Sequence, residues 1–78
     1  MRVYEATSND GEEFFRVVRW LYAADLGPAT RVWGTETPMK LRVAIEADDP
    51  RLAPFAGQVG DASKWTVSPP LPPGEPGG

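Results

Sequence analysis

The sequence contains no cysteine and no histidine. Without cysteine the fold has no disulfide, and the soft ligands on which protein zinc sites depend are missing. Without histidine, serines such as Ser63 have no imidazole to accept a proton, so hydrolase chemistry of the triad type is excluded. A glycine-rich phosphate loop is also absent. We therefore expect a protein that is not an enzyme and that holds no cofactor.

The acidic residues also lack the spacing of a catalytic or metal site. Glu12-Glu13 and Asp48-Asp49 are adjacent pairs, and both stand where a helix would begin, so they are expected to favour the positive end of a helix. Asp48, Asp49 and Asp61 lack the regular alternation of a calcium-binding loop. The prediction is that the chain has no metal site.

Long hydrophobic runs are absent too. No apolar stretch approaches the roughly 20 residues of a membrane span. Residues 1–13 include Glu5, Asp10, Glu12 and Glu13 and contain no apolar segment of the kind found in secretory signals. The expectation is a cytoplasmic protein without a membrane partner.

Seventy-eight residues, 41% of them hydrophobic, suit one small domain with a single core. We assign this domain to residues 1–68 and an extended or disordered tail to residues 69–78, which hold five of the nine prolines. The spacing of Pro69 and Pro72 resembles ligands of polyproline-reading domains, although no arginine flanks it. The net charge of -3 arises beyond residue 42, and it gives no general attraction for nucleic acid.

The clearest structural pattern is the alternation of apolar and polar residues over residues 39–46. Successive side chains of a strand point to opposite faces of a sheet. One face of this strand would enter the core, with Met39, Leu41, Val43 and Ile45. The other face would meet solvent or a partner, with Lys40, Arg42, Ala44 and Glu46.

Residues 12–26 can be read in two ways. Phe14, Val17, Val18 and Leu21 recur at helical spacing, and Gly27-Pro28 is a typical helix stop. The sequence Asn9-Asp10-Gly11 is instead a hairpin signal, and the segment is rich in residues that favour strands. The helix is the preferred interpretation.

Four short strands are expected at residues 2–7, 30–35, 39–46 and 64–67, the last of them at an edge because prolines follow it. Within the first strand, Val3 faces one side, and Tyr4 and Ala6 the other. A helical turn should start at Pro50 with Asp48 or Asp49 as its cap, be limited by Pro54 to one or two turns, and lead into a loop over residues 57–61. The predicted fold class is α+β, with one amphipathic helix packed on a small antiparallel sheet; the alternative is a small all-β barrel.

The aromatic residues carry the functional prediction. Three tryptophans exceed what so small a core easily hides, and interfaces are enriched in Trp, Tyr and Arg. Trp20 and Trp33 are out of phase with their apolar neighbours, so they should be partly exposed, whereas Trp65 should be in the core. The sequence predicts a protein-binding module, an adaptor or inhibitor that occupies a surface on a larger protein, as an inhibitor encoded by a phage or mobile element would. The expected partner-binding residues are Trp20, Trp33, Tyr22, Arg16, Arg19 and Arg42.

A small nucleic-acid-binding module is the alternative function. It would use basic side chains to neutralise phosphates, with Trp33 or Tyr22 stacking on a base. These basic residues are Arg16, Arg19, Arg31, Lys40 and Arg42. Acidic residues such as Glu36 and Glu46 would oppose this binding if they shared the surface.

Overall fold

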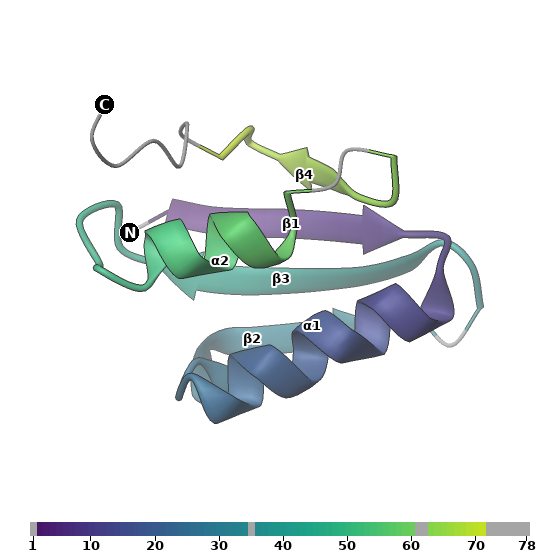
Figure 1. Ribbon diagram of the computed structural model, residues 1–78, viewed down its shortest axis with the longest axis horizontal. Helices are drawn as coiled ribbons and strands as arrows, with labels where there is room; N and C mark the ends of the chain where they lie inside the picture. Colours follow the sequence, from purple (N-terminus) through teal and green to yellow (C-terminus); the bar gives the residue numbers. More distant parts are fainter. Residues whose placement is uncertain (1, 35, 61–62, 72–78) are drawn as a thin grey trace.

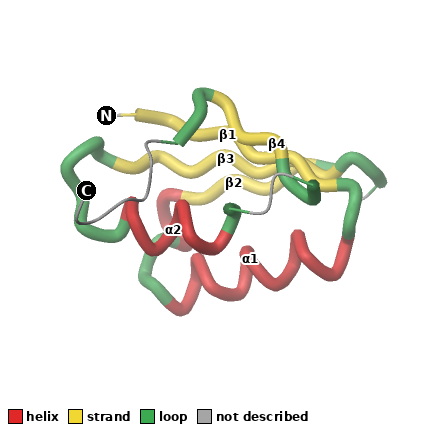
Figure 2. The backbone as a smooth tube through the Cα atoms, turned by 45° about the horizontal axis from the view of Figure 1, so that its top comes forward, coloured by secondary structure: helices red, strands yellow, loops and turns green. Residues whose placement is uncertain are grey.

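The computed structural model describes residues 2–34, 36–60 and 63–71. Its elements are β1 (Arg2–Ser8), α1 (Gly11–Ala23), one 3-10 turn (Gly27–Ala29), β2 (Thr30–Trp33), β3 (Met39–Ile45), α2 (Leu52–Gln58) and β4 (Thr66–Ser68). The four strands form one antiparallel sheet in the order β2-β3-β1-β4 (Figure 1). Both helices lie on the same side of this sheet, so the domain has two layers (Figure 2).

The connectivity consists of two interlocked β-α-β units. The first, β1-α1-β2, leaves a gap that β3 fills, and the second, β3-α2-β4, encloses β1. This order of elements is the ferredoxin-like arrangement, which hosts many unrelated functions. The predicted α+β class is confirmed. The sheet is open, with β2 and β4 as its edges, so the alternative of a closed barrel is wrong. The short helical turn expected after Asp49 is present as a second helix of seven residues.

The register of β1 and β3 sets the two faces of the sheet. Tyr4 lies opposite Val43, and Glu5 opposite Arg42. Tyr4 and Ala6 are buried, as their alternation with Val3 predicts. Residues of odd number in β1 therefore share the outer face with residues of even number in β3.

The segment after β1 is a helix, and the competing hairpin is wrong. The Asp10 carboxylate accepts the backbone N–H of Glu13 at 3.1 Å, which caps α1 rather than closing a two-residue turn. The helix ends at Ala23, three residues before the predicted end. Asp25 takes the left-handed conformation with φ of 64°, and the Leu26 N–H donates to the Leu21 carbonyl at 2.8 Å.

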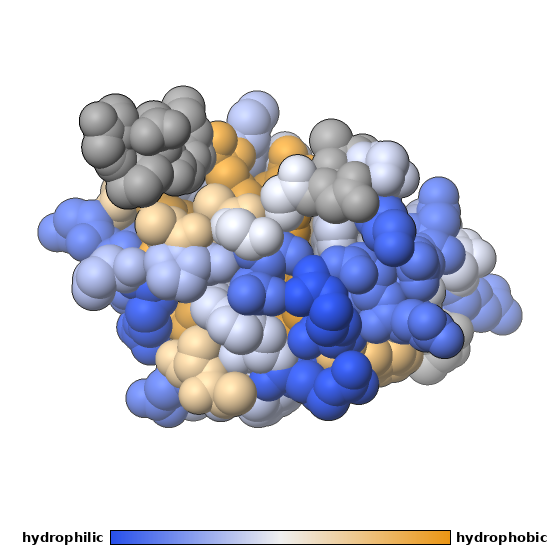
Figure 3. Space-filling model, in the orientation of Figure 1, coloured by the Kyte–Doolittle hydropathy of each residue, from blue (hydrophilic) through white to orange (hydrophobic). Residues whose placement is uncertain are grey.

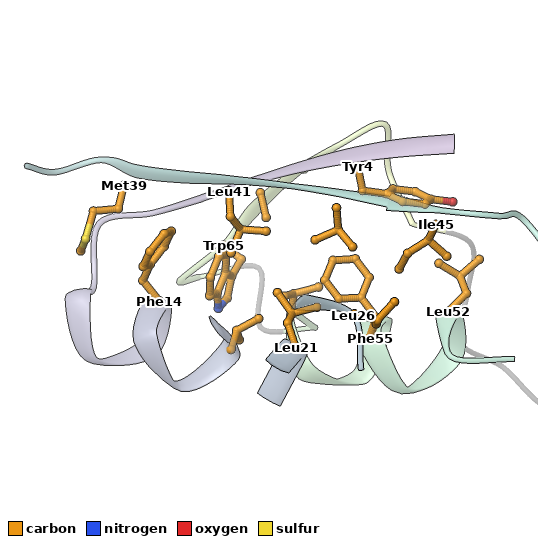
Figure 4. Packing of buried hydrophobic residues seen from close by; sticks show 14 residues of the cluster. Tyr4, Phe14, Leu21, Leu26, Met39, Leu41, Ile45, Leu52, Phe55 and Trp65 are labelled. Atoms are coloured by element: carbon orange, nitrogen blue, oxygen red, sulfur yellow. The ribbon is translucent and has the colours of Figure 1, made fainter. Parts of the chain in front are cut away.

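The core lies between the sheet and the two helices (Figure 4). Side chains from the inner face of the sheet point toward those of α1 and α2, and Phe14 and Leu21 pack beneath Leu41 as the pattern predicts. Val18, expected in the core, is only partly buried at its margin. The residues buried in this cluster are Tyr4, Ala6, Phe14, Val17, Leu21, Leu26, Met39, Leu41, Val43, Ile45, Leu52, Phe55, Val59 and Trp65.

The second helix differs from the prediction at both ends. It begins at Leu52 rather than Pro50, and neither aspartate caps it with a side chain. Asp49 instead accepts hydrogen bonds from the backbone and guanidinium of Arg51. Pro54 falls in the first turn, where its missing N–H costs no helical hydrogen bond, so the helix continues through Gly57 and Gln58. The predicted loop therefore starts later, and its Asp61 lies outside the described residues.

The last strand is also shifted relative to the prediction. β4 comprises Thr66–Ser68 and pairs with β1 at the edge of the sheet, which confirms the edge position. Trp65 precedes the strand and is buried, with its ring stacked on Phe14 at 6.1 Å between centroids. Leu71 packs against the margin of the core, and the rest of the predicted tail, residues 72–78, lies outside the described residues.

Candidate functional site

The face of the sheet that points away from both helices presents a group of exposed side chains, which we call the open face. Figure 2 shows that α1 and α2 both lie on the other side. The pairing of the strands places these side chains in rows across the sheet: Trp33 beside Lys40 and Thr7, then Arg31 beside Arg42 and Glu5, then Ala44 beside Val3. The open face therefore collects residues from three strands that are far apart in the sequence.

Charge on the open face is mainly positive. Glu5 pairs with Arg42, with 3.1 Å between Oε2 and Nε, and more distantly with Lys40, with 3.8 Å between Oε1 and Nζ. Arg31 donates to the backbone carbonyl oxygens of Pro28 and Thr30 at 3.2 and 3.1 Å, and no ion pair is seen between it and a carboxylate of the described residues. In these rows three cations thus stand near one carboxylate, which pairs with two of them, although the whole chain has a net charge of -3.

Trp33 covers part of this cationic group. Its ring lies against the guanidinium of Arg42, with 5.5 Å from Cζ to the ring centroid, and 43% of the residue remains exposed. A shallow depression of about 280 Å³ lies beside it, lined in part by Val3 and Ala44 and bordered by Arg31 and Arg42. The lining of the depression therefore combines apolar and cationic side chains.

The strand that carries Trp33 is also an edge of the sheet. β2 pairs with β3 on one side only, so alternate backbone N–H and C=O groups of Thr30–Trp33 point outward. Val32 points to the opposite side of the sheet from Trp33, and it too is 42% exposed. The edge therefore has an exposed apolar side chain on each face.

The predicted partner-binding residues fall into two groups. Trp33 and Arg42 lie together on the open face, as do Arg31 and Lys40 from the nucleic-acid alternative. Trp20, Tyr22, Arg16 and Arg19 all lie on α1, in the other layer. The structure therefore does not unite the six predicted residues into one surface.

The α1 residues also differ in what they contact. Arg16 donates to the Glu13 carboxylate, and its Nη2 donates to the carbonyl oxygen of Gln58 at 2.6 Å, so it links α1 to α2. Trp20 stacks on Phe55, with ring centroids 6.4 Å apart. Both side chains are thus engaged in holding the helical layer together.

Tyr22 and Arg19 are exposed residues of α1 without that connecting role. Tyr22 lies over Gly27, where a Cβ would stand 2.3 Å from the Tyr22 ring. Figure 3 views the molecule from the helical side, where hydrophilic residues predominate and the hydrophobic residues form separate small areas.

Two contributors to the open face were missed in the sequence, Val3 and Glu5, and so was Val32, which is exposed at the β2 edge on the other side of the sheet. The alternation of residues 2–7 and 39–46 was visible, but their mutual register was not. Pairing those two segments in antiparallel order, with the odd positions of the first beside the even positions of the second, would have placed Glu5 between Lys40 and Arg42.

The shifted carboxyl groups belong to ion pairs. Hydrogen bonds from Arg51 lower the pKa of Asp49 to about 2. The hydrogen bond from Arg16 lowers the pKa of Glu13, and another from the Trp65 indole adds to this effect. Carboxyl groups that stay ionised to lower pH are unlike a general acid, whose pKa is raised toward neutrality. These pairs instead fix the start of α2 and the contact between the helices.

A second hollow of about 330 Å³ lies where β1 ends and β4 begins. Its polar lining includes Asp10, which caps α1 and lies 3.8 Å from the Lys64 ammonium. Within the described parts of the chain, no three acidic side chains gather as a metal site would require. None of the helices there is long and apolar enough to cross a membrane.

Comparison with known proteins gave no family model, no curated protein and no solved structure that matches this chain. The physical properties of the open face are therefore the basis for assigning a function.

Proposed function

We propose that this chain is a non-catalytic protein-binding module of the cytoplasm that acts as an adaptor or inhibitor, and that it binds a larger protein through the open face. The observation that carries this proposal is Trp33, half-exposed beside Arg42 on a face that neither helix covers. Exposed tryptophan and arginine side chains provide much of the binding energy at protein interfaces. The residues that stabilise the domain lie on the other side of the sheet, so the open face is available for a partner.

The depression beside Trp33 supports the same function. Val3 and Ala44 in its lining can contact an apolar side chain, while Arg31 and Arg42 in the same lining provide donors for polar groups. Apolar centres with polar rims are typical of protein interfaces. Occupation of such a surface would block or recruit the partner without any chemical step.

Photo-crosslinking in cells that express the protein natively tests the proposal. A photoreactive benzoyl-phenylalanine placed at Lys40 stands directly beside Trp33, whereas one at Ala53 is exposed on α2 in the other layer. The expected result is a polypeptide adduct from position 40 that resists nucleases and that disappears when Trp33→Ala is added. Trp33→Ala should still fold, because the side chain is partly exposed, and circular dichroism checks this point.

Two results would contradict the proposal. Adducts of equal yield from positions 40 and 53 would show that the open face is no preferred interface. An adduct from position 40 that nucleases degrade would identify a nucleic acid as the partner.

A nucleic-acid-binding module is the second candidate, because Arg31, Lys40 and Arg42 converge on the face that also holds Trp33. Tryptophan can stack on a base while the cations neutralise phosphates. Single-stranded oligonucleotides should then bind with an affinity that falls steeply as salt is added. Absence of binding at low salt would remove this candidate.

A further inference from the structure

The two edges of the sheet differ in how open they are to another strand. β4 has only three residues, and Pro69 and Pro70 follow it directly, so the chain beyond it has two positions without an N–H donor. β2 has no such block: within Thr30–Trp33 every residue has a backbone N–H, and no described strand pairs with its outer side. The β2 edge is therefore the better site for strand addition.

Side chains along the β2 edge would determine which strand can join it. Arg31 and Trp33 point to the open face, and Val32 points to the helical side. A residue of an added strand that lies directly opposite Val32 would share its side of the sheet, and the residues beside it would share the open face with Arg31 and Trp33. Among the described residues, the Arg31 guanidinium donates its hydrogen bonds to backbone carbonyl oxygens and pairs with no carboxylate, so a carboxylate of an added strand would be attracted to it.

We propose that an extended acidic peptide segment of the partner protein pairs with β2 as a fifth strand of the sheet. This inference rests on the proposed protein-binding function and specifies its ligand. An apolar side chain of the peptide contacts Val32, and the acidic side chains before or after it lie on the open face near Arg31 and Arg42. Backbone hydrogen bonds provide affinity, and the alternation of acidic and apolar side chains provides selectivity.

Two features of the open face favour a peptide over a nucleic acid. Trp33 is the one aromatic side chain that the described strands place on this face, which gives a single stacking position at its margin. Glu5 lies in the central strand between Lys40 and Arg42, where it would repel a phosphate chain. A nucleic acid also has no alternating amide groups with which to continue the hydrogen-bond ladder along β2.

A second copy of the chain fits the edge less well than an acidic peptide. Pairing β2 with β2 would bring two copies of Arg31, Lys40 and Arg42 side by side on one continuous face. Like charges so placed oppose association. Charge complementarity therefore selects an acidic occupant.

Selection from a random peptide library displayed on phage tests this inference with the intact chain as bait. Enriched peptides should alternate acidic and apolar residues. A synthetic peptide of this kind should bind the Arg31→Glu variant about tenfold more weakly, because repulsion replaces attraction at one exposed position. Arg19→Glu, a matched change on α1, should leave the affinity unchanged.

Methylation of the peptide backbone tests the strand pairing itself. Only alternate N–H groups of an added strand point toward the edge. Methylating one alternate set should abolish binding, and methylating the other set should leave it nearly intact.

The inference is overturned if no peptide is enriched, if the enriched peptides show no acidic residues, or if both methylated sets bind equally. It is also overturned if oligothymidylate competes with the peptide. A nuclease-resistant adduct at Lys40 combined with any of these results would support the proposed protein-binding function but contradict the pairing of an acidic peptide with β2. Absence of that adduct would contradict the proposed protein-binding function itself.

Discussion

Replacement of Phe55 by alanine should remove a large part of the stability of the domain. Phe55 is fully buried, and its ring lies 6.2 Å from Tyr4 of β1 and 6.4 Å from Trp20 of α1. It thus joins α2 to both the sheet and the first helix. A helix of seven residues does not persist alone in water, so α2 depends on this packing.

The magnitude follows from burial. Truncating a buried phenylalanine to alanine costs about 3 to 5 kcal/mol, through lost apolar contact and the cavity that is left. Domains are stabilised by roughly 0.05 to 0.15 kcal/mol per residue, which gives about 4 to 12 kcal/mol for a chain of this length. Phe55→Ala should therefore lose a quarter or more of the free energy of unfolding and expose the indole of Trp20 to water.

Urea denaturation followed by circular dichroism and tryptophan fluorescence measures this loss. Phe15→Ala is the matched control: the same substitution on α1, at a residue that is 51% exposed and contacts Phe14 edge-on. It should cost under about 1 kcal/mol, as surface substitutions generally do. Equal losses for the two variants would refute the assignment of Phe55 as the residue that anchors α2.

Three further predictions concern the ends of the helices. Asp10→Ala removes the cap of α1 and should cost about 1 kcal/mol, whereas Asp10→Asn should retain most of the stability; thermal unfolding distinguishes them, and equal losses would exclude the capping role. Asp49→Asn should lower the melting temperature at neutral pH, because Arg51 lowers the folded-state pKa of Asp49 and so stabilises the fold while this carboxylate is ionised. The difference in melting temperature should vanish as the pH falls from the ordinary pKa of 3.8 to about 2. A difference that does not depend on pH would contradict the pairing of Asp49 with Arg51. Gly27→Ala places a Cβ against the Tyr22 ring and should lower the free energy of unfolding by about 1 to 3 kcal/mol. The double variant with Tyr22→Ala should recover part of this loss, whereas additive effects of the two substitutions would show that the ring moves aside freely.

Local pattern was enough to predict the elements whose signals agree. Alternation over residues 39–46 indicated β3 and its inner face, and the helical spacing of Phe14, Val17 and Leu21 indicated α1. The expectation that Trp65 is buried and Trp33 partly exposed also agrees with the structure. These features depend on neighbours in the chain, which a sequence displays directly.

Contacts between segments that lie far apart in the chain could not be predicted from the sequence. Trp20 was expected to be partly exposed because it is out of phase with the apolar side of α1, and it is only partly buried, but its stacking on Phe55 of α2 could not be foreseen. Glu5 lies in a strand that the sequence predicts, but its ion pairs with Lys40 and Arg42 depend on the pairing of this strand with β3. The start of α2 was misplaced because Arg51 engages Asp49, which was expected to cap the helix. Each of these outcomes depends on the three-dimensional arrangement of side chains.

The separation between a packed helical layer and an outward strand surface makes this small domain a convenient framework for engineered recognition. Positions such as Thr7, Arg31 and Lys40 can be diversified without disturbing the interior, since none of them contributes to the buried cluster. Because the chain has no cysteine, binders derived from it would keep their shape in reducing compartments, where scaffolds that rely on cross-links lose theirs.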